Sequence, residues 1–101
     1  MGNNGNNTEN KKDKSYYELE RIVKGVANHR RIEILEILGK RPEMSVAEIA
    51  EKVKSNFKTT SEHIRRMAIA GLLMKRSDSK SIRHKLTKRG ELILTFLRML
   101  E

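Results

Sequence analysis

Apolar residues recur every three or four positions in several segments of the chain, which is the pattern of amphipathic helices. The first such segment follows Ser15, a favourable helix-capping residue, and runs to about Val26. Residues 1–14 contain no strongly apolar residue after Met1, so hydrophobic burial cannot offset the entropy lost on ordering them. We therefore expect a disordered tail at 1–14 and one folded domain at 15–101.

The second helical segment is more apolar than the first. It follows Asn28, another capping candidate, and extends from His29 to about Leu38. Its isoleucines and leucines spread over more than one face, so this helix is expected to be the most buried. Gly39 and Pro42 should end it.

Two further helical segments lie close together in the sequence. The first is short and starts at Ser45, which has the spacing of a capping box with Glu48. The second starts after Ser55 or Asn56 and ends near Gly71, a residue suited to the left-handed conformation that closes many helices. Two helices joined by so few residues are typical of a helix-turn-helix.

Beyond this helix pair the periodicity changes from helical to alternating. Residues 72–76 and 81–86 are predicted strands, and in the second strand apolar positions and His84 alternate with Arg83 and Lys85. The intervening Ser-Asp-Ser-Lys is typical of a turn, so the segment predicts a β-hairpin.

A last helix, capped by Thr87, completes the chain. The order of elements predicts a winged helix-turn-helix, a mainly α fold with a small β-hairpin. In such a fold the second helix of the pair enters the major groove of DNA. The hairpin then reaches phosphates or the neighbouring minor groove.

The charge of the chain also favours an anionic partner. It carries 22 Lys and Arg against 13 Asp and Glu, a formal charge of +9. Segment 58–89 contains ten basic residues and only two acidic ones, so it carries +8 of that charge. Charge that served only solubility would be interspersed, whereas a concentrated basic segment is typical of nucleic-acid binding.

Four stretches resemble the ArsR-like winged-helix transcriptional regulators: VANHRRIEILEIL, SVAEIAEKV, TTSEHIRRMAIAGLL and KLTKRGE. They cover the chain from about Val26 to Gly90. The resemblance implies a dimeric, repressor-like fold with SVAEIA as the positioning helix and residues 57–70 as the recognition helix. It further implies base-facing residues on that helix and a basic wing: Lys58, Thr59, Ser61 and Glu62, with Arg83 and Lys85 on the wing.

Further contacts to phosphate are expected from Arg65 and Arg66 on the recognition helix and from Lys80 at the hairpin turn. The alternative for Arg65 is a solvated helix face, paired with Glu62 three residues earlier. Glu62 itself could accept a hydrogen bond from a cytosine amino group, repel incorrect docking, or serve only that pair. Phe57 could touch a thymine methyl group, but we expect it to pack against the preceding helix.

No metal, cofactor or catalytic site is expected. The metal sensors among the ArsR-like regulators carry thiolates in the positioning helix, or Asp and His in the terminal helix. The corresponding stretches here, SVAEIAEKV and KRGELILTFLRMLE, have none of these ligands, and the chain has no Cys. The three histidines, His29, His63 and His84, lie in separate elements. No nucleophile, base and orienting group occur together, so an enzyme is not expected.

The first and last helices hold more apolar residues than a domain of this size needs. We expect a homodimer through these residues, which would match two half-sites on one duplex: Tyr16, Leu19, Ile93, Phe96, Leu97 and Leu100. The alternative is that they close the core of the monomer.

Together these patterns predict a sequence-specific regulator of transcription that binds double-stranded DNA. The alternative is a winged-helix adaptor for protein or non-specific nucleic-acid binding, for which an exposed apolar patch and mixed charge would be typical. Because the sequence has neither a signal-peptide pattern nor a membrane span, we expect a cytoplasmic protein, associated with the nucleoid if prokaryotic.

Overall fold

The structure, a computed structural model, describes residues 13–101. These residues form five helices and one two-stranded antiparallel hairpin. In chain order the elements are α1 (Tyr16–Val26), α2 (His29–Lys40), α3 (Val46–Val53), α4 (Phe57–Ile69), β2 (Leu73–Ser77), β3 (Ile82–Leu86) and α5 (Lys88–Arg98). The predicted winged helix-turn-helix is therefore confirmed, while residues 1–12 of the predicted tail lie outside the described residues.

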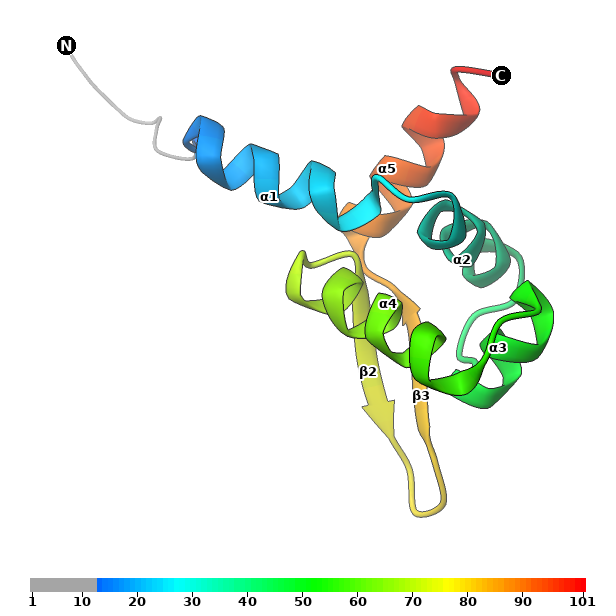
Figure 1. Ribbon diagram of the computed structural model, residues 1–101. Helices are drawn as coiled ribbons and strands as arrows, with labels where there is room; N and C mark the ends of the chain where they lie inside the picture. Colours follow the sequence, from blue (N-terminus) through cyan, green and yellow to red (C-terminus); the bar gives the residue numbers. More distant parts are fainter. Residues whose placement is uncertain (1–12) are drawn as a thin grey trace, which may run out of the picture.

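The helix-turn-helix and the hairpin project on one side of the molecule, and the first turn of α1 and the last turn of α5 on the other. Figure 1 shows α2, α3 and α4 grouped in the body, with the hairpin turn extending beyond α4. The free ends of α1 and α5 point away from that turn. The fold thus separates the predicted recognition elements from the predicted dimerisation helices.

The helix starts follow the capping residues of the sequence. The Ser15 and Ser45 hydroxyls each accept a hydrogen bond from the amide of a Glu three residues later, and that Glu accepts one from the serine amide. Asn56, rather than Ser55, caps α4 and accepts a 2.7 Å hydrogen bond from Thr59 N. After α4, Gly71 has a φ of +81°, the left-handed conformation expected there.

One expectation about α2 is wrong. The helix runs through Gly39 and ends at Lys40, because Gly39 lies against α5: a Cβ there would come within 2.6 Å of Leu94 Cδ2. The absent side chain allows close helix packing and does not terminate the helix. The helix buries Ile34, Leu35 and Leu38 in the core, while Ile32 is 37% exposed.

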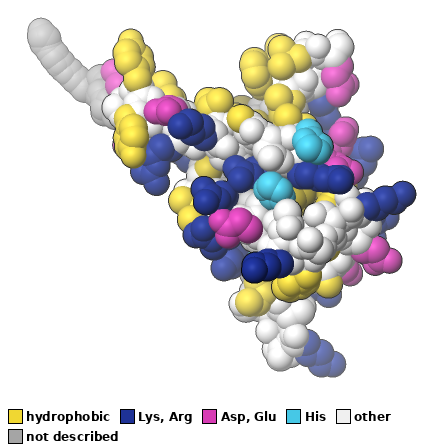
Figure 2. Space-filling model, in the orientation of Figure 1, with side chains coloured by type: hydrophobic (Ala, Val, Ile, Leu, Met, Phe, Trp, Pro, Cys, Tyr) yellow, Lys and Arg dark blue, Asp and Glu magenta, His cyan; other side chains and the backbone are white. Residues whose placement is uncertain are grey.

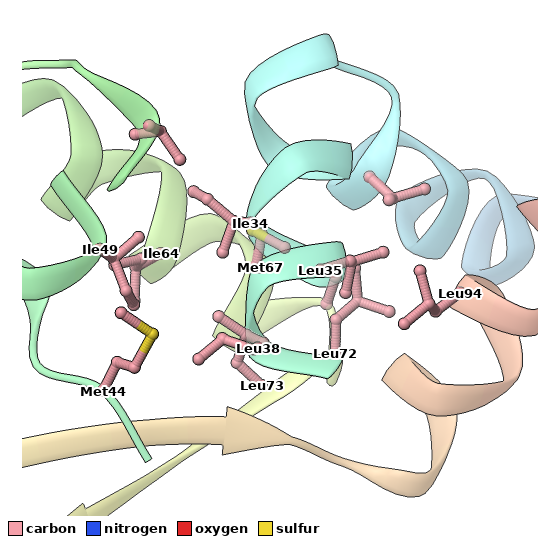
Figure 3. Packing of buried hydrophobic residues seen from close by; sticks show 13 residues of the cluster. Ile34, Leu35, Leu38, Met44, Ile49, Ile64, Met67, Leu72, Leu73 and Leu94 are labelled. Atoms are coloured by element: carbon pink, nitrogen blue, oxygen red, sulfur yellow. The ribbon is translucent and has the colours of Figure 1, made fainter. Parts of the chain in front are cut away.

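The core joins all the elements that carry the helix-turn-helix. Figure 3 shows residues of α2, α3, α4 and α5 and the start of the hairpin converging: Ile34, Leu35, Leu38, Met44, Ile49, Ile64, Met67, Leu72, Leu73 and Leu94. Thr60, Ile64 and Met67 bury the inner face of α4, as their spacing predicts. This packing fixes which face of α4 remains exposed.

The hairpin is anchored at its base and free at its tip. His84 is buried, and its backbone exchanges two hydrogen bonds with Met44, of 2.8 and 3.1 Å. Each strand starts one residue later than predicted; β2 also ends one residue later, at Ser77, whereas β3 ends at Leu86 as predicted. Ile82, which shares the alternation of His84 in this strand, is nevertheless 50% exposed, because the tip extends beyond the body.

Candidate nucleic-acid interface

The outer face of α4 is the centre of the candidate interface. With Thr60, Ile64 and Met67 buried, the helical period leaves the predicted recognition residues on the opposite side. Ser61 is half-buried, and the others are exposed: Lys58, Thr59, Glu62, Arg65 and Arg66. The structure thus brings all six predicted residues of this helix onto one accessible surface.

Glu62 holds both arginines of this surface. Its carboxylate accepts hydrogen bonds of 3.0 and 2.8 Å from Arg65 and one of 2.8 Å from Arg66 Nε. Hydrogen bonds from Arg65 and then Arg66 lower the pKa of Glu62 to about 2. The predicted Glu62–Arg65 pair is present, and Arg66 joins it, so Glu62 reduces the positive charge that these arginines present.

A further arginine, from α2, lies beside α4. Arg31 Nε donates a 3.0 Å hydrogen bond to His63 Nδ1, and Arg31 Nη1 donates to the carbonyl of Lys24 at 3.1 Å. The pKa of His63 is lowered, by burial first and then by Arg31, which keeps the ring neutral and able to accept this bond. Sequence reasoning missed Arg31, because no local pattern indicates that α2 reaches the recognition helix here.

Figure 2 shows Lys and Arg side chains gathered over α1 and α4, around two His and an acidic group. Phe57, which we expected to pack against the preceding helix, is 59% exposed at the first turn of α4. An apolar ring therefore lies beside Lys58 on the accessible end of the helix.

On the wing, register decides which side chains share a face. Arg83 pairs with Arg76 and Lys85 with Met74, so Arg83 and Lys85 share one face as predicted. Arg83 donates a 3.0 Å hydrogen bond to the carbonyl of Glu43, and Arg76 a 2.7 Å hydrogen bond to the Glu43 carboxylate. Both arginines therefore tie the hairpin to the loop before α3.

The remaining wing lysines differ in accessibility. Lys85 is half-buried and lines a cavity between β3, α2 and α5, whereas Lys80 is exposed at the turn. Asp78 shapes that turn by accepting 2.8 Å hydrogen bonds from the amides of Lys80 and Ser81. Lys75, on the opposite face, is exposed and has no carboxylate within 4.0 Å among residues 13–101. The sequence pattern did not single out Lys75. Its place on the wing, opposite His84 and on the other face from Arg83 and Lys85, follows from the strand register.

The candidate dimerisation residues fall into two groups. Tyr16 is 91%, Leu19 45%, Phe96 55% and Leu100 67% exposed. Ile93 and Leu97 are partly buried and pack on the core, so the alternative of monomer packing applies to these two. Leu94, which the sequence stripe omitted, is the fully buried apolar residue of α5.

Within residues 13–101, no cluster of His, Asp and Glu has an arrangement that could hold a metal ion. None of the described helices is both long and apolar enough to cross a membrane.

Residues 27–85 match the model of one protein family, the MarR family. No curated protein sequence matches the chain.

The fold is similar to that of several solved structures. The homodimeric winged helix-turn-helix DNA-binding domain of Mb0332 from Mycobacterium bovis, described as a possible ArsR-family regulator, has a TM-score of 0.76 and 22% identity, covering 83% of this chain and 78% of that one. HlyU from Vibrio cholerae has a TM-score of 0.75 and 24% identity, over 87% of this chain and 96% of that one. NolR from Sinorhizobium fredii has a TM-score of 0.75 and 26% identity, over 83% and 84%.

Proposed function

We propose that this chain, which belongs to the MarR family and is a DNA-binding transcription regulator, recognises a specific double-stranded site. In this proposal it binds as a homodimer, with α4 in the major groove. Family and fold are those of regulators rather than enzymes. The observation that carries the proposal is the geometry of α4. Its inner face is fixed in the core, while its first two turns present Lys58, Thr59 and Glu62 to solvent. A helix held in this way can enter the major groove without rearrangement.

In this proposal the residues have different tasks. Lys58, Thr59, Ser61 and Glu62 face bases, and Arg65 and Arg66 contact phosphate. Lys80, Arg83 and Lys85 were predicted for the wing. The exposure of Lys80 and Lys75 favours these two as its main phosphate contacts. Phe57 adds an apolar group that can touch a thymine methyl.

The dimer would form through the exposed apolar residues of α1 and α5, in a chain whose tail precedes one folded domain. Mb0332 is described as homodimeric, which supports this arrangement. We further propose an ArsR-like mode of action without metal sensing. Cytoplasmic location, at the nucleoid if prokaryotic, would follow from it.

The test is selection of bound sequences from random duplex DNA with the wild type and with Lys58→Ala. We expect a palindromic motif for the wild type. For Lys58→Ala we expect about 1–3 kcal/mol less discrimination against random DNA, the contribution of one good base contact. Lys52→Ala, a change at an exposed lysine of α3, is the matched control for charge. Equal loss of specific and random binding in Lys58→Ala would make this residue a backbone contact. A featureless selected pool would instead favour the winged-helix adaptor.

A further inference from the structure

The loop before α3 contains a residue with a strained backbone, Glu43. Its φ is +66°, in the left-handed region that favours glycine. Lys54, the other non-glycine residue with a positive φ among residues 13–101, closes the C-terminal end of α3. Glu43 has no such role, because α2 already ends at Lys40. A glutamate in this conformation costs free energy, which its own contacts must offset.

These contacts join Glu43 to both strands of the wing. Its carboxylate accepts a 2.7 Å hydrogen bond from Arg76 Nη1 of β2, and its carbonyl oxygen accepts one of 3.0 Å from Arg83 Nη1 of β3. The two arginines are partners in the strand register, so one residue holds both sides of the hairpin. Arg83 Nε also lies 3.8 Å from the carboxylate of Asp78. Each of these wing arginines thus has a carboxylate of the chain itself close by.

The two residues after Glu43 connect the wing to the helix-turn-helix. Met44 is buried and its backbone exchanges two hydrogen bonds with His84 of β3. Figure 3 shows the Met44 side chain directed at core residues of α3 and α4. Ser45 then caps α3. Because these contacts come from three consecutive residues, the base of the wing has little freedom to move relative to α3 and α4.

We propose that Glu43 is a specificity-determining residue, which acts by positioning the arginines of the wing. Its carboxylate withholds Arg76 from DNA phosphate, and its carbonyl oxygen holds Arg83 against the loop. The wing then contacts phosphate mainly through Lys75 and Lys80, at a fixed distance from α4. The proposal rests on the proposed function, since it requires that the wing meets DNA beside the groove that α4 enters.

The restraint matters because an arginine on phosphate carries no sequence information. Once released from Glu43, Arg76 can contact phosphate on any duplex, wherever α4 lies. At the preferred site the wing lysines already contact the nearby phosphates, so the released arginine adds less there. Loss of the carboxylate should therefore raise affinity for random DNA more than affinity for the preferred site. A purely structural role predicts the opposite, because a loosened wing lowers affinity for all DNA.

The experiment compares the wild type with Glu43→Gln on a random duplex and on the selected site, by fluorescence anisotropy at several salt concentrations. For Glu43→Gln we expect several-fold tighter binding of the random duplex, a log–log salt slope steeper by roughly 0.9 per wing, and a lower ratio of specific to random affinity. Adding Arg76→Gln restores the net charge of the wild type and should cancel all three effects.

Two further variants control for charge and for backbone strain. Glu51→Gln removes the same charge from an exposed glutamate of α3 with no Lys or Arg nitrogen within 4.0 Å among residues 13–101, and it should change neither affinity nor slope. Glu43→Gly removes the carboxylate but suits the left-handed conformation. It should reproduce the effect of Glu43→Gln on DNA and have a higher Tm than Glu43→Ala.

Weaker binding of all DNA by both Glu43→Gln and Glu43→Gly would overturn the proposal and leave Glu43 a structural role. An equal gain for Glu51→Gln, or a gain that Arg76→Gln does not cancel, would also overturn it, since net charge alone would then explain the effect. If the wild type selects no DNA sequence, the DNA-recognition proposal fails. In that case the salt slope on random duplex still decides whether Glu43 withholds Arg76 from phosphate.

Discussion

Among single residues, Glu62 exerts the most direct control over the charge of the recognition surface, because it holds Arg65 and Arg66 at 2.8–3.0 Å. Glu62→Gln removes the negative charge and should raise affinity for random duplex DNA several-fold, since both arginines become free for phosphate. Fluorescence anisotropy with a random-sequence duplex measures this change. If Glu62 instead accepts from a cytosine amino group, the variant should lose preference for the selected site without gaining affinity for random DNA.

The effect of Glu62→Gln on DNA affinity should not depend on pH, and this can be checked. With its pKa lowered to about 2, Glu62 stays ionised at every pH at which DNA binding is measured. The affinity ratio of Glu62→Gln to wild type should therefore be constant between about pH 5 and 8.

His84 should make folding stability depend on pH. Burial lowers its pKa from 6.5, outweighing the hydrogen bond with the Met44 carbonyl, and Lys75 lowers it further. The unfolded state thus binds the proton more readily, so this contribution is complete above about pH 6.5 and is lost as pH falls through the folded pKa. Between pH 7.5 and 5, thermal unfolding should show a larger fall in Tm for the wild type than for His84→Gln.

His63 has a pKa lowered in the same direction, but it is present in both proteins and so does not create the difference. The lowered pKa values of Glu48, Glu62 and Asp78 act below about pH 4.5, outside this window. Parallel Tm curves for the two proteins would show that His84 gains a proton without disturbing the fold.

Among the elements, the wing gives a quantitative test. Replacing Lys80, Arg83 and Lys85 with Ala should lower affinity for all DNA and leave the preferred sequence nearly unchanged, because phosphate carries no sequence information. Each lost contact should flatten the log–log salt dependence by roughly 0.9. Titrations at several salt concentrations measure both effects.

The structure refines this expectation into a matched comparison. Lys75→Ala with Lys80→Ala removes two exposed lysines, whereas Arg83→Ala with Lys85→Ala removes two half-buried residues. We expect the first pair to account for most of the change in slope. The second pair should instead lower Tm, since Arg83 donates to the Glu43 carbonyl. Unchanged slopes in both pairs would remove the wing from the binding surface.

Element positions could be predicted from the sequence because their causes are local. Ser15, Asn28, Ser45 and Thr87 cap helices through residues two or three positions ahead. Gly39, by contrast, was assigned a terminating role, because its contact with Leu94 exists only once α5 packs on α2. Capping and periodicity depend on neighbours in sequence, whereas packing depends on neighbours in space.

The candidate site likewise has features that depend on neighbours in sequence and features that depend on neighbours in space. The outward face of α4 was predictable from its period of 3.6 residues, and the Glu62–Arg65 pair from its spacing. The exposure of Phe57 and the contact of Arg31 with His63 both require the tertiary arrangement. A sequence pattern can thus indicate that a basic surface exists, but not which side chains from other elements lie against it.

For the whole molecule, the decisive property is whether two chains associate. A monomer would leave Tyr16, Leu19, Phe96 and Leu100 largely in water, on two helices that extend from the body (Figure 1). Exposed apolar residues on two such helices favour an interaction site. Two copies related by a two-fold axis would cover it and place two recognition helices on one duplex.

Phe96→Glu tests this arrangement, because Phe96 is 55% exposed and its replacement does not disturb the core. Desolvating a carboxylate in an apolar interface is costly, so the variant should be a folded monomer. It should bind a single half-site weakly. Its Tm should not depend on protein concentration, as expected for a monomer. Leu97→Glu should also lower the intrinsic stability of the monomer, since Leu97 packs against the core. Sedimentation velocity gives the oligomeric state, and circular dichroism reports folding. A wild type that sediments as a monomer at high concentration would refute the dimer, and recognition would then have to rest on one α4 and one wing.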